Sequence, residues 1–111
     1  MDREVAVYSD YANFLFQAGR AQDAVAQWEA LLSLMQAKQE PPYELAQYQF
    51  DLARALWRDG KRARAREVAT IVLHVLRTEP PTQQLGGHIR RDWRADQVED
   101  WFEDPDAWER D

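Results

Sequence analysis

The chain has 111 residues, of which 45% are hydrophobic and 12% aromatic, enough for one folded domain with a modest core. It contains no cysteine, so neither a disulfide framework nor a thiolate metal site can form. Its net charge of −6 argues against nucleic acid as a partner, because neutralising phosphates needs a basic surface. No apolar run reaches the roughly 18 residues of a membrane-spanning helix, and the acidic start "MDREVAVYSD" is unlike a signal peptide. We therefore expect a cytoplasmic protein without a membrane partner.

Residues 1–80 favour helix almost throughout, because they are rich in alanine, leucine, glutamine, arginine and glutamate. Gly19 and Gly60 each follow an apolar run and precede a basic residue, which is typical of a helix C-terminus. The proline pairs at 41–42 and 80–81 mark the other breaks. This punctuation predicts four helices, at about residues 2–18, 21–38, 42–59 and 62–78.

The four predicted helices form two copies of one unit, related by the offset that carries Gly19 onto Gly60. The same offset pairs Tyr11 with Leu52, Ala12 with Ala53, Leu15 with Leu56, Phe16 with Trp57, Ala24 with Ala65, and Leu31 with Val72. An internal repeat of this kind is typical of a helical array. Its small residues predict close helix crossings, so we expect Ala12, Ala24, Ala53 and Ala65 to be almost fully buried.

This pattern resembles the tetratricopeptide repeat, in which large apolar and small residues are followed by a turn glycine and then by an alanine four residues before an aromatic. The first copy carries Tyr8, Tyr11, Ala12, Leu15, Gly19, Ala24 and Trp28, and the second carries Leu52, Ala53, Leu56, Gly60 and Ala65. The second copy departs from the pattern at Gln49 and Ala69, where aromatics are usual. The period of 41, longer than the common 34, is similar to the extended repeats of some bacterial regulators and of kinesin light chains.

The resemblance implies an all-α fold, a right-handed helical repeat solenoid over residues 1–81. Its two helix-turn-helix units would span about residues 2–40 and 41–81. Two repeats are fewer than the three or so that a stable solenoid needs, so the exposed end requires a cap. We expect residues 82–111 to supply a capping helix and an acidic aromatic tail.

The predicted capping helix runs from about residue 88 to residue 102, after the glycine pair at 86–87. It would pack five apolar side chains against the helix at 62–78: Ile89, Trp93, Val98, Trp101 and Phe102. Asp104 followed by Pro105 is typical of an N-cap and a first-turn proline, and predicts a final short turn that carries Trp108.

The sequence offers no catalytic constellation. His74 lies in an apolar helix and His88 follows the glycine pair, and neither accompanies a nucleophile motif. The acids of residues 103–111 lack the glycine and the spacing of a calcium loop. The basic run "RDGKRARAR" is either a solvated turn and helix face or an anion-binding patch. We therefore expect no enzymatic activity, no cofactor and no metal.

In tetratricopeptide proteins the first helix of each unit lines a concave surface that binds peptides. The resemblance therefore implies a partner-binding surface made of Asn13, Phe16, Gln17, Gln47, Phe50, Arg54, Trp57 and Arg58. Phe16 and Trp57 occupy matching positions and have a second interpretation, as packing between the units. Phe50, Arg54 and Arg58 form a stripe with a spacing of four, and an aromatic ring beside two guanidinium groups suits a peptide with acidic and aromatic side chains.

Charge is distributed unevenly along the chain. Residues 1–94 hold 12 acids and 13 lysines and arginines, whereas residues 95–111 hold 8 acids and one arginine. The tail is therefore complementary to the basic-aromatic stripe, and we expect Trp101, Phe102 and Trp108 to dock there, either in the same chain or in a neighbour's to give a homodimer. The alternative is that Trp101 and Phe102 complete the cap while Trp108 stays in solvent.

Two functions follow from these patterns. The first is a non-enzymatic adaptor or scaffold that binds a peptide or a partner helix in its concave groove. The second is a structural fragment, the terminal repeats of a larger bacterial regulator or kinase, whose acidic, tryptophan-rich tail mediates self-association. In both interpretations the partner is a protein, not a nucleic acid or a membrane.

Overall fold

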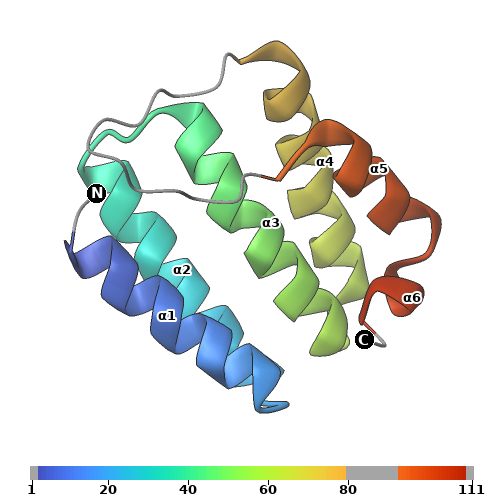
Figure 1. The fold of residues 1–111 in the computed structure, drawn as a ribbon, viewed down its shortest axis with the longest axis horizontal. Coiled ribbons are helices and arrows are strands. Elements are labelled where there is room, and N and C mark those ends of the chain that lie inside the picture. The colour runs from blue at the N-terminus through green and yellow to red at the C-terminus, as the bar shows by residue number, and fades with distance from the viewer. Residues whose placement is uncertain (1–2, 80–92, 110–111) are drawn as a thin grey trace.

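The computed structural model of the chain describes residues 3–79 and 93–109, and within these ranges every regular element is a helix (Figure 1). The helices are α1 (Arg3–Gln17), α2 (Ala21–Ala37), α3 (Pro42–Arg58), α4 (Arg62–Thr78), α5 (Ala95–Glu103) and α6 (Pro105–Glu109). The predicted all-α class is confirmed. No helix in the described ranges combines the length and the apolar character needed to cross a bilayer.

The ends of the first four helices lie close to their predicted positions. The glycine signals explain this agreement, because Gly19 and Gly60 adopt φ values of 80° and 83° in the left-handed region. The next amide then bonds back to the helix, from Lys61 to the Leu56 carbonyl at 2.9 Å for example. Helix α2 ends in the same way without a glycine, since Gln39 has a φ of 57°.

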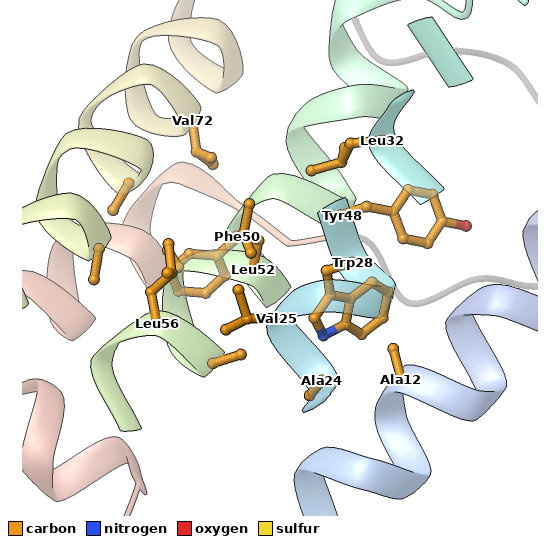
Figure 2. Packing of buried hydrophobic residues seen from close by; sticks show 14 of the residues in the cluster. Ala12, Ala24, Val25, Trp28, Leu32, Tyr48, Phe50, Leu52, Leu56 and Val72 are labelled. Atoms are coloured by element: carbon orange, nitrogen blue, oxygen red, sulfur yellow. The ribbon is translucent and has the colours of Figure 1, made fainter. Parts of the chain in front are cut away.

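Each helix packs against the next one along the chain, from α1 through to α6. The predicted burial of the small residues is confirmed, because Ala12, Ala24, Ala53 and Ala65 are each 0% exposed. Figure 2 shows how this works in the first unit, where Ala12 and Ala24 lie beside the indole of Trp28. Their short side chains leave room for the large ring, which is itself buried and contacts Tyr48 of α3.

The C-terminal segment, residues 93–109, differs from the prediction in its first half. Helix α5 begins at Ala95, whereas the sequence predicted a helix from about residue 88. Residues 88–92, with His88 and Ile89, lie outside the described residues. Arg94 is extended, with a ψ of 158°, and its backbone amide is capped by the Gln97 side chain at 2.8 Å, so the helix starts immediately after it.

The aromatic rings of the predicted capping helix also meet a different helix from α4. Helix α5 packs against α4, as expected for a cap, and Val98 is fully buried. Its aromatic rings, however, contact α3, where Trp101 meets Phe50 and Trp57. On α4 itself Ile71 remains 54% exposed, so the cap does not cover that side of the helix.

The fully buried alanines provide a test of the packing. Replacing Ala53 with leucine would force a larger side chain into a crossing that has no free space, and we expect the free energy of unfolding to fall by about 1–3 kcal/mol. The matched control is Ala30→Leu on the exposed side of α2. Alanine and leucine have similar helix propensities, so the free energy of unfolding should change by no more than about 0.5 kcal/mol. Equal denaturant midpoints for both variants would contradict the close crossing at Ala53.

Candidate peptide-binding surface

One side of α3 carries half of the residues that the sequence predicted as a binding surface. Gln47, Phe50, Arg54 and Trp57 recur every three or four residues, so they share one face of the helix. We call this the α3 face. Gln47, Phe50 and Trp57 are only 3%, 0% and 5% exposed, because the C-terminal segment of the same chain lies over them.

Phe50 is the centre of the contact between α3 and the C-terminal segment. Its ring meets three indoles edge to face: Trp93 with centroids 4.9 Å apart, Trp101 at 5.9 Å and Trp108 at 6.1 Å. Pairs in this geometry contribute about 0.5–1.5 kcal/mol each beyond the burial of their surface. A single α3 side chain therefore holds residues from the start, the middle and the end of the segment.

Gln47 fixes the point where the segment arrives on α3. Its side-chain amide donates to the Trp93 carbonyl at 3.1 Å and its oxygen accepts from the Trp93 amide. The pair satisfies both backbone groups of a residue that lies outside any helix. The Trp93 indole also donates to the Asp51 carboxylate at 3.3 Å. Trp93 is thus anchored through its backbone, its indole nitrogen and its ring.

Helix α6 is attached to the other end of the α3 face through Asp106. The Trp57 indole donates to the Asp106 carboxylate at 2.8 Å, a hydrogen bond to an ionised acceptor. The Arg62 guanidinium lies 3.6 Å from the same oxygen, and both side chains are more than half exposed, so this ion pair is worth about 0–1 kcal/mol. Arg62 and Arg66 also stack near the Trp57 ring, at 4.6 and 5.3 Å from its centroid.

Arginines join the α3 face to α1. The Arg54 guanidinium lies 5.2 Å from the centre of the Phe16 ring and 5.7 Å from that of Trp108, so one cation is shared between α1 and α6. Arg58 stacks on Phe16 at 4.6 Å and donates to its carbonyl at 3.3 Å. That carbonyl belongs to the last turn of α1, where a positive charge is favourable.

Local hydrogen bonds start both helices of the segment. Arg94 donates to both oxygens of Asp96, at 3.1 and 3.3 Å, and this bond lowers the pKa of the exposed Asp96 carboxyl below its usual value. The interaction is present when Asp96 is ionised and is lost as the pH falls through that pKa. The carboxylate of Asp104 accepts from the Ala107 amide at 3.1 Å, which confirms the predicted N-cap of the last turn.

Trp101 is the most deeply buried aromatic of the segment, with 0% exposure. It lies among the rings of Phe50, Trp57 and Phe102, each at a steep angle to it. Its buried indole nitrogen has no hydrogen-bond partner among the described residues. Trp101 is therefore held by apolar packing.

The structure places the predicted site residues in two groups. Gln47, Phe50, Arg54 and Trp57 lie under or against the C-terminal segment, together with Trp101, Phe102 and Trp108. Asn13, Gln17 and Arg58 are exposed at the side of α1, next to the half-buried Phe16. The hypothesis that the tail docks on the basic-aromatic stripe holds within a single chain. The homodimer stays a prediction.

The sequence did not indicate three members of this surface in their observed roles. Trp93 was expected on α4, and Asp51 and Asp106 were not singled out as partners of particular indoles. The usable signal was the pairing of an acidic, tryptophan-rich tail with a helix that is rich in aromatic and basic residues. That signal predicts that the two meet, but not which atoms pair.

The remaining titratable residues form no further site within the described part of the chain. His74 is exposed on α4, distant along the helix from any nucleophile motif. Across residues 3–79 and 93–109 no three histidine, aspartate or glutamate side chains gather in a way that could hold a metal ion. The chemistry of the α3 face is accordingly that of rings, guanidinium groups and carboxylates.

Comparisons of the chain with known protein families, with curated proteins and with solved structures find no match.

The different burial of the tryptophans predicts different effects of removing them. Trp101→Ala would leave a large cavity and should lower the free energy of unfolding by about 3–5 kcal/mol. Trp108→Ala removes a half-buried ring and one cation–π contact, and should cost only about 1–2 kcal/mol. Urea denaturation of the two variants measures both values, and a larger loss for Trp108→Ala would contradict the described burial.

The hydrogen bond between Trp57 and Asp106 can be tested directly. Asp106→Ala removes the acceptor, so we expect the Trp57 indole proton to exchange with solvent faster and its NMR resonance to shift. Asp100→Ala is the matched control, because Asp100 is an exposed acid of α5 and its loss changes the net charge equally. If both variants leave the Trp57 resonance unchanged, α6 does not lie on the α3 face in solution.

Proposed function

We propose that this chain is a non-enzymatic adaptor built from two tetratricopeptide-like helical units, and that its α3 face binds a peptide segment of a partner protein. The observation that carries the proposal is the way in which the face holds α6. An acidic side chain accepts from Trp57 while an indole two residues later packs on Phe50 and Arg54. In this interpretation α6 is an internal ligand, and a partner peptide binds the α3 face through the same kinds of side chain.

The proposed partner segment follows from these contacts. It carries an acidic residue and, two residues later, a tryptophan or similar ring on one helical turn, as Asp106 and Trp108 do. Arginine supports such a ligand in two ways, because a guanidinium can stack on a ring and can also pair with a carboxylate. The proposed partner is therefore a protein with an acidic aromatic motif, and the chain works without a cofactor.

The shortness of α6 and the exposure of its ion pair support its displacement by a partner. The helix spans only Pro105–Glu109, and its pair with Arg62 is exposed on both sides. The neighbouring Gln17 of α1 is exposed, and an incoming peptide can begin to bind there. The binding free energy of such a peptide needs to exceed only that of α6, because Trp93 and Trp101 hold the rest of the segment on α3.

The second candidate is a structural unit of a larger assembly, with the tail mediating self-association. The contacts of α6 favour it, because Phe50 and Trp57 of a neighbouring copy would present the same ring and indole to α6. In that case α6 docks on the α3 face of a neighbouring copy through the same contacts. Both candidates fit a cytoplasmic protein of bacterial type. They differ in what replaces α6 on the α3 face, which is a partner peptide in the first and α6 of another copy in the second.

A peptide titration tests the adaptor proposal. The receptor is a shortened chain that ends at Glu103, and the probe is a peptide with the sequence of residues 103–111, EDPDAWERD. Partial burial of the Trp108 ring contributes about 1–2 kcal/mol, and the hydrogen bond to Trp57 contributes about 1.5–3 kcal/mol. Together they predict a dissociation constant on the order of 1–10 mM. Chemical-shift perturbation should map to Phe50, Arg54 and Trp57, and the full chain should bind at least about tenfold more weakly, because its own tail competes.

Two controls make the titration specific. A peptide with alanine in place of Trp108 should not bind, and Arg54→Glu in the receptor should abolish binding, whereas Arg3→Glu at the start of α1 should leave it unchanged. Failure of the shortened chain to bind the peptide, with its helical content intact, would contradict the proposal. A full chain that sediments as a dimer, and becomes monomeric in Trp108→Ala, would favour the second candidate.

A further inference from the structure

A row of apolar side chains lies on the outer face of α1, away from the core. Val7, Tyr11 and Phe14 are 62%, 49% and 65% exposed, and their spacing of four and then three places them on one stripe of the helix. The opposite face of α1 carries Val5 and Ala12, which are buried in the core. Helix α1 is therefore apolar on two sides, which is typical of a helix packed between two neighbours. In Figure 1 α1 lies at the side of the bundle away from α5 and α6.

The internal repeat shows what this stripe does elsewhere in the chain. With the offset that carries Gly19 onto Gly60, the stripe of Val7, Tyr11 and Phe14 corresponds to Tyr48, Leu52 and Ala55 of α3. These three are buried, and the Tyr48 ring contacts Trp28 of α2 with centroids 6.2 Å apart. Figure 2 shows Tyr48 and Leu52 of α3 in one cluster with Val25, Trp28 and Leu32 of α2. The stripe of α3 that corresponds to the α1 stripe is thus covered by helix α2.

From this correspondence we infer that the outer face of α1 binds an amphipathic helix of a partner protein, one that presents a large apolar stripe like that of α2. The α2 stripe consists of Val25, Trp28 and Leu32, with spacings of three and four. In the new contact, the partner helix packs on α1 in the way that α2 packs on α3. It is separate from the α3 face, so this chain can hold two partners at once.

A second copy of the chain fits the α1 stripe less well than a separate helix. The described helices offer no free stripe of this kind: that of α2 is covered by α3, and α4 carries Arg66 and Ala69 where α2 carries Val25 and Trp28. Side-by-side pairing of two α1 helices would join only the stripes themselves. Such a pairing would therefore lack the contact that Tyr48 of α3 makes with Trp28 of α2 at the corresponding position.

The test uses the chain's own α2 as the probe. A helix-stapled, fluorescein-labelled peptide with the sequence of residues 21–37 is titrated with the full chain, and binding is followed by fluorescence polarisation. We expect saturable binding that weakens at least about tenfold in Val7→Gln and in Phe14→Gln. Both positions are exposed, so the variants should keep the wild-type melting temperature and circular dichroism. A peptide with alanine in place of Trp28 should bind at least about tenfold more weakly.

The control variant is Ile71→Gln, which removes a similarly exposed apolar side chain from α4 and should bind the peptide like the wild type. Arg54→Glu on the α3 face should also leave this binding unchanged, so the result is independent of the proposed peptide site. Equal affinity of wild type and Phe14→Gln for the peptide would overturn the inference, as would no binding at all. Sedimentation of the wild type as a dimer that Phe14→Gln dissociates would also overturn it, because the occupant would then be a second copy.

Discussion

The attachment of the C-terminal segment depends on one aromatic side chain, the fully buried Phe50 of α3. Phe50 holds three tryptophans from a segment that lies far from it along the chain. Its counterpart in the first unit, Ser9, is polar and bonds only to its own helix at the Ala6 carbonyl. The second unit therefore has a surface that must be covered, and the C-terminal segment covers it. Both the cap and the proposed ligand chemistry originate from this difference between the two units.

The C-terminal segment combines two modes of attachment along its length. Trp93 and Trp101 hold it by backbone pairing and by full burial, which are strong and specific. Trp108 and Asp106 add one exposed ion pair, a shared arginine and one indole hydrogen bond. The first part completes the core, and the second part attaches a short helix to the surface of α3. In the proposed function, a partner peptide competes with this second part.

The two ends of the helical stack are unequal. At one end α5 covers α4, and Arg77 of α4 pairs with Glu99 of α5 at 3.3 Å. At the other end α1 presents Val7 and Phe14 to solvent. Large apolar groups on an exposed helix face mark interaction sites more often than single exposed residues do. The chain therefore has a closed end and an end suited to continued helix packing.

Much of the fold could be predicted from sequence because its signals are local or repeated. Gly19 and Gly60 gave the helix ends through their left-handed backbone, and the offset between them identified Ala12 and Ala53 as crossing points. The charge asymmetry predicted that the tail meets α3. The place where the segment meets α3 could not be predicted, because it depends on Gln47 pairing with the backbone of Trp93, which is distant in sequence. The pairing of Trp57 with Asp106 is equally non-local, and no periodicity encodes it.

Phe50 holds the C-terminal segment within its own chain. Isotope-filtered nuclear Overhauser spectroscopy on a mixture of labelled and unlabelled protein tests this contact, because it separates contacts within a molecule from contacts between molecules. We expect cross-peaks between the Phe50 ring and the indoles of Trp93, Trp101 and Trp108 inside one molecule, at every protein concentration. Absence of these cross-peaks, or their appearance only between labelled and unlabelled molecules, would contradict this contact.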